Sequence, residues 1–117
     1  MIVLAAGDVI PAVSHPLAQT YTDVELARSL VYWAAWCVAE DDERAPLAAA
    51  AAKAFATEAA VVACERSIQV HGGTGFTWEH PLHRFYKRAL WLEGLGSRPS
   101  ELRGEVADAV LGVSVPV

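Results

Sequence analysis

A glycine-rich stretch between two helix-forming segments constrains this chain more than any other feature. It runs from Gln69 to Pro81 and reads Gln-Val-His-Gly-Gly-Thr-Gly-Phe-Thr-Trp-Glu-His-Pro. Paired glycines end a helix well, because glycine accepts the left-handed backbone that closes the last turn. Proline suits a first helical turn, where its missing N–H is not needed. The stretch therefore predicts a tight connection between two helices, with backbone amides open to close approach by a ligand.

Composition narrows the class of protein. The chain has 117 residues, enough for one domain, and 54% of them are hydrophobic with alanine dominating, which favours packed helices over a sheet. A net charge of -5 argues against a nucleic-acid surface, which needs clustered lysine and arginine. Residues 1–6 are apolar, but they lack a basic start and are too short to span a membrane. We expect no targeting segment, no membrane span and a cytoplasmic protein.

The expected fold is all-α, an antiparallel up-and-down bundle of three to four helices. Its segments are an irregular lead-in over 1–14, the bundle over 15–113 and a tail over 114–117. The expected helices run from about Pro16 to Asp41, from Pro46 to His71, from Pro81 to about Leu95, and from an N-cap at Ser100 to about Leu111.

Spacings of three and four residues predict the buried face of each helix. On the first helix these are Val24, Ala27, Leu30, Val31, Ala34 and Val38, broadened by Leu26, Trp33 and Cys37. Trp33 and Trp36 together imply burial against a neighbour. On the second helix they are Phe55, Ala59, Val62 and Ile68, with Lys53, Glu58, Glu65 and Arg66 expected in solvent. On the third helix they are Leu82, Phe85, Ala89 and Leu92.

The other polar residues and the two cysteines predict few binding sites. Arg84, Lys87 and Arg88 form a basic stripe on the third helix, which suits either a phosphate or plain solvation. His80 and His83, with Glu79, could place ligands on one helical face, but they do not form a recognised metal-binding pattern and no convincing third ligand accompanies them. We therefore expect no metal site. Cys37 and Cys64 are expected to be free thiols in apolar surroundings.

The glycine-rich stretch resembles the C-terminal signature of the acyl-CoA dehydrogenase family. That signature reads Gln-x-His-Gly-Gly-x-Gly-Phe-Thr-x-Glu-x-Pro and continues into a basic, aromatic helix, here His83 to Ala89. Upstream, Ala12 to Ala18 and Asp23 to Arg28 resemble a long helix of the same domain. The resemblance implies α,β-desaturation of an acyl-CoA with FAD as cofactor.

By matching position, the resemblance also implies which residues contact the cofactor. They touch the diphosphate and adenosine end of a FAD that is held mainly by a neighbouring subunit, and they are Gln69, His71, Gly72 and Gly73. From the residues alone, the alternative is a simple glycine cap between two helices.

The sequence departs from the family pattern in two places. The Arg-x-Gln-Phe-Gly stretch that helps to hold the flavin diphosphate has no match, and Gly96 stands where typical members carry the catalytic glutamate. Glu93 and Glu101 lie nearby but outside that motif, so no catalytic residue is assigned.

The resemblance implies two further domains that this sequence does not contain. We therefore expect the chain to join a homo- or hetero-oligomer with a more complete subunit, to meet acyl-CoA only there, and to be inactive alone. The alternative is a non-catalytic helical interaction subunit, or a gene remnant, that binds no flavin. An apolar face left without its first helix predicts self-association or a partner.

Overall fold

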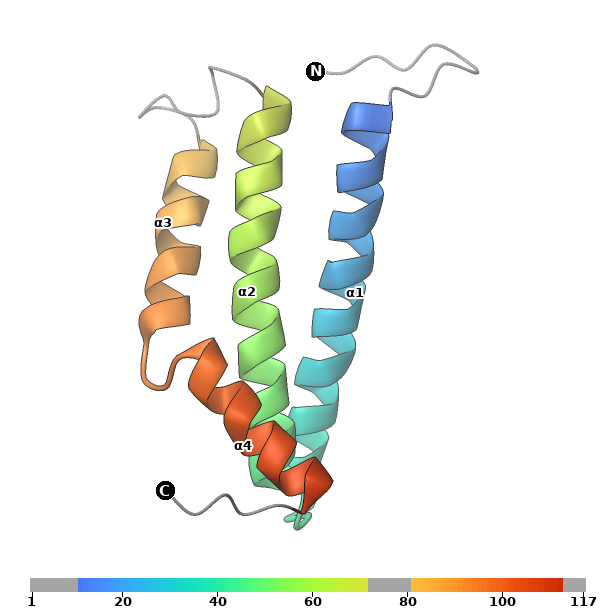
Figure 1. Cartoon of the computed structure of the whole chain (residues 1–117), viewed down its shortest axis with the longest axis vertical. Coiled ribbons are helices and arrows are strands. Elements are labelled where there is room, and N and C mark those ends of the chain that lie inside the picture. The colour runs from blue at the N-terminus through green and yellow to red at the C-terminus, as the bar shows by residue number, and fades with distance from the viewer. Residues whose placement is uncertain (1–10, 72–80, 113–117) are drawn as a thin grey trace.

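The computed structural model describes residues 11–71 and 81–112, and these form four helices without a strand. The helices are α1 (Pro11–Ala39), α2 (Ala45–His71), α3 (Pro81–Gly94) and α4 (Pro99–Leu111). In Figure 1, α1 and α3 flank α2 on opposite sides and run antiparallel to it, and α4 crosses the lower end of α2 obliquely. The prediction of an all-α bundle is confirmed.

Helix α2 is the centre of the fold, and its small side chains explain why. Its buried residues lie on two opposite sides, with Ala48, Ala52 and Ala59 on one and Ala50, Ala54, Val61 and Ile68 on the other. Ala50 and Ala54 form a core cluster with Leu102 and Val106 of α4, so the opposite side faces α1. Alanine favours a helix and lets neighbours approach closely on both sides. α2 is also long and apolar enough to cross a membrane, a test that core helices of soluble proteins pass as well.

Helix α1 begins earlier than the sequence predicts. It starts at Pro11, so the last four residues of the expected lead-in 1–14 are helical, while residues 1–10 lie outside the described part. Pro16 is the sixth residue of the helix, so it lies beyond the first turn and removes one backbone N–H that would bond the carbonyl four residues earlier. The Thr20 hydroxyl donates to the Pro16 carbonyl over 2.8 Å.

The charged turn between α1 and α2 is held by one carboxylate. The Asp42 carboxylate accepts from the Arg44 backbone N–H (2.8 Å), from Arg44 Nε (3.0 Å) and from Nη2 (3.1 Å). These hydrogen bonds hold the pKa of Asp42 below its ordinary value. Asp41 has a φ of 52°, a left-handed conformation that aspartate tolerates.

The start of α4 corrects another prediction. Ser100 is not the N-cap, because the helix begins one residue earlier at Pro99, after Arg98. Proline is favoured at the first helical position, and the Arg98 N–H donates to the Glu101 carboxylate over 3.4 Å. At the other end, Gly112 has a φ of 65° and its N–H donates to the Asp108 carbonyl over 3.0 Å.

Much of the predicted apolar surface is exposed in the single chain. On α1 the side facing α2 runs through Leu30, Ala34 and the fully buried Cys37, so Val24, Val31 and Val38 fall beside it and lie exposed. Phe85 keeps 60% of its surface, so the prediction that it is buried in the bundle is wrong. Trp36 keeps 52%, so the burial predicted for it, against a neighbour within the chain or outside it, is not reached within the single chain. Spacings of three and four predict an apolar face on each outer helix that is wider than the side by which the helix contacts its neighbour. The rest of that face is exposed in the single chain.

Three side chains expected in solvent instead connect helices. Arg66 Nη1 lies 3.2 Å from Asp23 Oδ2 between α2 and α1. Glu58 pairs with Arg103 between α2 and α4. Lys53 Nζ donates to the carbonyls of Leu95 and Ser97 in the connection between α3 and α4. Long charged side chains reach these partners because their stems lie along apolar surface.

Candidate functional site

Gln69 lies on the last turns of α2, exposed, at a hollow shared with α3. The hollow has a volume of about 140 Å³ and is lined by Glu65, Ile68, Gln69 and Tyr86. Tyr86 comes from α3, so the second and third helices together place an amide, a carboxylate and an aromatic ring around one opening. A glutamine amide both donates and accepts hydrogen bonds without a charge, which suits contact with a polar ligand edge.

His71 is the last residue of α2, and its ring turns back along the helix. Its Nδ1 lies 2.8 Å from the Ser67 carbonyl oxygen, which can only accept, so Nδ1 is the donor. Ser67 precedes the four terminal carbonyls of the helix, so this hydrogen bond fixes the ring against the last turns of α2 and does not cap the helix end. The predicted site residues Gly72 and Gly73 lie outside the described part of the chain.

The charge at the hollow is negative. The C-terminal end of α2 carries the negative end of the helix dipole, and Glu65 adds a carboxylate. Arg84 and Arg88 of α3 are exposed, but each is two residues from Tyr86 and so lies on the side of α3 away from the hollow. An anionic group beside this site would therefore depend on amide donors, not on the end of α2.

Gly96, which the resemblance aligns with a glutamate, adopts a left-handed turn. Gly96 has a φ of 73°, which favours glycine, and a Cβ added there would lie 3.4 Å from Lys53 Nζ. Lys53 holds the turn through the carbonyls on either side of Gly96, at Leu95 and, over 2.9 Å, at Ser97. The turn thus gives a physical reason for a glycine instead of a carboxylate at this position.

A polar hollow of about 400 Å³ lies where α3 meets α4. Its charged lining residues are Glu58, Glu93, Arg98 and Arg103. Glu93 is partly buried on the last turn of α3, whereas Arg98 is exposed. Sequence reasoning missed this corner, because Glu58 and Arg103 are far apart in the chain and neither belongs to a motif. Glu58 and Arg103 pair with each other, so this part of the cluster is accounted for without a ligand.

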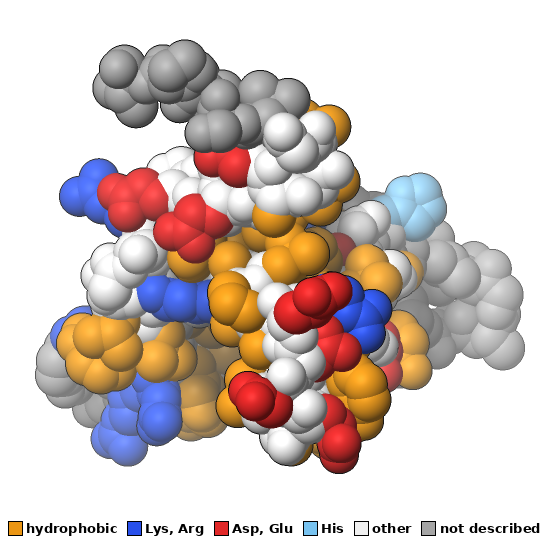
Figure 2. All heavy atoms as spheres, turned by 90° about the horizontal axis from the view of Figure 1, so that it is seen from below, with side chains coloured by type: hydrophobic (Ala, Val, Ile, Leu, Met, Phe, Trp, Pro, Cys, Tyr) orange, Lys and Arg blue, Asp and Glu red, His pale blue; other side chains and the backbone are white. Residues whose placement is uncertain are grey.

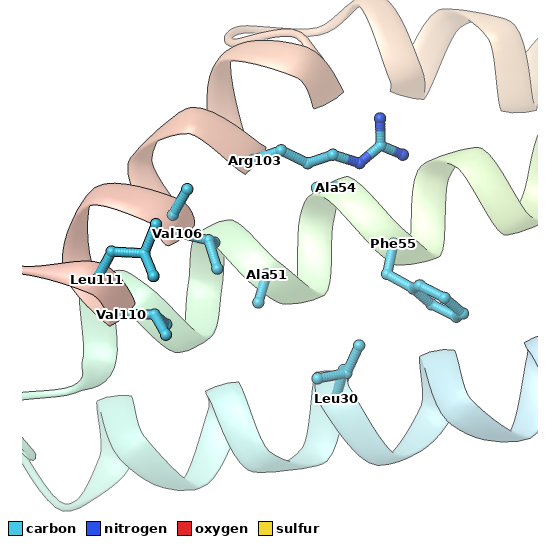
Figure 3. A pocket seen from close by; sticks show the side chains of 9 residues that line it. Leu30, Ala51, Ala54, Phe55, Arg103, Val106, Val110 and Leu111 are labelled. Atoms are coloured by element: carbon cyan, nitrogen blue, oxygen red, sulfur yellow. The ribbon is translucent and has the colours of Figure 1, made fainter. Parts of the chain in front are cut away.

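A larger groove of about 420 Å³ runs between α1, α2 and α4, but it has little chemical character. Figure 3 shows Leu30 of α1 facing Ala51 and Phe55 of α2 and the aliphatic side chains of α4, with Arg103 as the one charged residue of its lining. Figure 2 shows that end of the molecule, where hydrophobic surface is exposed among charged side chains. The groove offers apolar contact and no pair of groups suited to catalysis.

The described residues contain neither a cluster of metal ligands nor an exposed cysteine. Across residues 11–71 and 81–112, no three His, Cys, Asp or Glu side chains gather as a metal site, and Glu79 and His80 lie outside those ranges. Cys37 is fully buried and Cys64 partly so, and both are free thiols. Burial, together with the Glu65 charge, raises the pKa of the Cys64 thiol and leaves it a poor nucleophile.

Comparison with known proteins gives one consistent result. Residues 9–97 match the family described as acyl-CoA dehydrogenase, C-terminal domain. The chain is 37% identical over 94 residues to the probable acyl-CoA dehydrogenase YngJ of Bacillus subtilis, covering 79% of this chain and 24% of that protein. It is 37% identical over 91 residues to the acyl-CoA dehydrogenase IpdE2 of Mycobacterium tuberculosis, covering 78% and 27%. The chain therefore spans about a quarter of the length of these relatives.

Proposed function

Because this chain belongs to the acyl-CoA dehydrogenase family, through the C-terminal domain of that family, we propose that it supplies a FAD-contacting surface to an oligomer. In this proposal a more complete subunit carries the remaining domains, and the assembly acts in the cytoplasm as an oxidoreductase of acyl-CoA metabolism, in fatty-acid β-oxidation. The resemblance inferred from the glycine-rich stretch is confirmed by the family match, whereas the cofactor role is our proposal.

The exposed Gln69 amide carries this proposal. It lies at the opening between α2 and Tyr86 of α3. The exposed Arg84 and Arg88 are also residues of α3. The opening of about 140 Å³ is well below the roughly 300–1,000 Å³ of pockets that enclose a whole ligand. The described residues thus fit one edge of a dinucleotide, which agrees with a cofactor held mainly by another subunit.

In the assembly, FAD would supply the hydride acceptor for α,β-desaturation of an acyl-CoA. Gln69 would orient the diphosphate and adenosine end by hydrogen bonds, with His71, Gly72 and Gly73 beside it. Arg84 and Arg88 lie on the side of α3 away from Tyr86 and would add only long-range attraction for the diphosphate. We assign no proton-abstracting carboxylate to this chain, because Gly96 occupies that position in a left-handed turn, and we propose that the chain alone is inactive.

The test begins with the tagged full chain purified from its native cell extract. The visible spectrum reports bound flavin, and the mass of the complex reports a larger subunit. Gln69→Ala is expected to lower FAD retention, because an amide contact is lost. Gln19→Ala is the matched control, since Gln19 is an exposed glutamine of α1 that bonds Asp23. It should leave flavin retention unchanged.

Two outcomes would overturn the proposal. One is unchanged FAD retention in Gln69→Ala, and the other is a complex that contains a larger subunit yet remains colourless after FAD is added. A colourless protein that brings down no partner would favour the alternative, a non-catalytic helical protein that retains the family fold and binds no flavin.

A further inference from the structure

Basic and apolar side chains lie together on the side of α3 that faces away from α2. All of them are exposed; they are Arg84, Phe85, Lys87, Arg88, Trp91 and Leu92, hereafter the α3 face. Helix α3 packs on α2 through its other side, where Ala89 is buried and Tyr86 lines the small hollow. In Figure 1, α3 lies at the edge of the bundle, and no other described helix covers its outer side.

Helical spacing places the cations of the α3 face beside its aromatic rings. Arg84, Arg88 and Trp91 follow one another at spacings of four and three, so they form one row along the helix. Phe85 and Leu92 lie one turn before and after Arg88, in the row beside it. Trp91 keeps 63% of its surface, so an indole ring is exposed within one turn of a guanidinium.

The charge of the α3 face differs from that of the chain as a whole, which is acidic with a net charge of -5. Glu93, the only carboxylate of α3, falls on the side of Ala89, toward α2. Arginines within the other three helices pair with carboxylates, as Arg66 does with Asp23, whereas Arg84 and Arg88 form no ion pair with another described residue. A second copy of this face would bring like charges together, so its charge complements an anionic partner.

We propose that the α3 face binds an anionic lipid surface, with α3 lying in the plane of the membrane. Lysine and arginine are attracted to anionic headgroups, and tryptophan favours the boundary between water and hydrocarbon. Exposed basic residues together with Trp, Phe and Leu are the composition of helices that lie at a membrane interface. The 14 residues of α3 extend over about 21 Å along the edge of the bundle, so the whole face can meet one flat surface.

This contact is independent of the proposed flavin contact, because Gln69 and Tyr86 lie on the side of α3 that faces α2. Sedimentation of the purified full chain with vesicles tests it. The chain is expected to bind vesicles of phosphatidylcholine with phosphatidylserine and not vesicles of phosphatidylcholine alone, and added salt should weaken the binding. Binding to neither vesicle, or equal binding to both, would overturn the proposal.

An arginine substitution locates the binding surface. Arg88→Gln should weaken binding to the phosphatidylserine vesicles about fivefold, because one cation leaves the surface. Arg28→Gln is the matched control, since it removes the same charge from an exposed position on α1 and should leave binding nearly unchanged. Glutamine sustains a helix about as well as arginine, so both variants should fold, as circular dichroism will check. Equal effects of the two variants would contradict a contact through α3.

A tryptophan substitution separates a lipid surface from an acidic protein as the partner. Trp91→Ala should weaken binding about tenfold, because the ring no longer enters the apolar part of the interface. Trp36→Ala, at an exposed tryptophan of α1, is the matched control and should bind like the parent. Unchanged binding in Trp91→Ala, or soluble polyglutamate that binds as tightly as the vesicles, would assign the α3 face to an acidic protein and overturn the lipid proposal.

Discussion

Arg66 of α2 and Asp23 of α1 meet across the interface of the two longest helices, with Arg66 Nη1 lying 3.2 Å from Asp23 Oδ2. Their side chains keep 26% and 21% of their surface, and the same guanidinium nitrogen donates to Thr20 Oγ1 over 3.3 Å. Partial burial strengthens the attraction, and the second acceptor satisfies more of the guanidinium.

This pair should contribute measurably to stability. In a double-mutant cycle with Arg66→Met and Asp23→Asn, we expect a coupling of about 1 kcal/mol from urea unfolding. The exposed pair Glu25 and Arg28, three residues apart on α1, is the control and should give less than about 0.5 kcal/mol. Equal couplings would show that the contact between α1 and α2 adds nothing beyond a surface pair.

The glycine turn between α3 and α4 predicts substitutions of opposite sign. Gly96→Ala should destabilise the chain by about 1 kcal/mol, because its φ of 73° is unfavourable for alanine. Gly104→Ala should stabilise it by about 0.5–1 kcal/mol, because Gly104 lies inside α4 with nothing within 4 Å of an added Cβ. Thermal unfolding of both variants beside the parent measures the contrast. Two changes of the same sign would count against the left-handed turn.

The two cysteines should differ in reactivity. Burial raises the pKa of the Cys64 thiol, with a further contribution from Glu65, so its thiolate fraction at neutral pH is lower than that of a free cysteine. Alkylation of Cys64 by iodoacetamide should be slow at neutral pH and accelerate above the ordinary thiol pKa. Cys37 is fully buried and should react only on unfolding. Glu65→Gln should speed the Cys64 reaction, measured by mass spectrometry; a slower reaction would contradict the assigned cause.

The Asp42 turn predicts a dependence of stability on pH. Its carboxylate has a lowered pKa in the folded chain, chiefly through the Arg44 hydrogen bond. The stabilisation is therefore present above the ordinary aspartate pKa and is lost as pH falls through the lowered value. Asp42→Asn should lower the thermal midpoint at neutral pH, and the gap to the parent should narrow in acid. Glu43→Gln, which alters the adjacent charge, is the control; a gap that widens in acid would refute this account.

The sequence predicted helices well because their signals are local. Alanine runs, the proline at the start of α3 and the breakers around Gly96 act through the backbone of their own segment, so α2 and α3 end within a residue or two of expectation. The early start of α1 at Pro11 differs from the expected lead-in over 1–14, because proline suits the first turn of a helix as well as an irregular segment.

Side-chain contacts between helices were less predictable. Lys53, Glu58 and Arg66 are charged, so composition placed them in solvent, yet their partners lie more than 40 residues away in the chain. Likewise, spacing cannot say which half of a wide apolar face meets a neighbour, and Val31 and Phe85 fell on the exposed half. At the candidate site, Gln69 was found from the motif, whereas its neighbour Tyr86 needed the packing of α3 on α2.

Because α2 lies between α1 on one side and α3 with α4 on the other, the extensive helix contacts of the described residues all involve it. The pair of α1 with α2 and the group of α2 with α3 and α4 are therefore two cooperative units that share α2. Either unit can unfold locally while the other stays folded. Amide exchange would be slowest in α2 and would proceed at separate rates in α1 and in the α3–α4 pair. An assembly that binds α1 would directly stabilise the unit formed by α1 and α2. It would affect the glycine-rich stretch that follows α2 only through the backbone of α2.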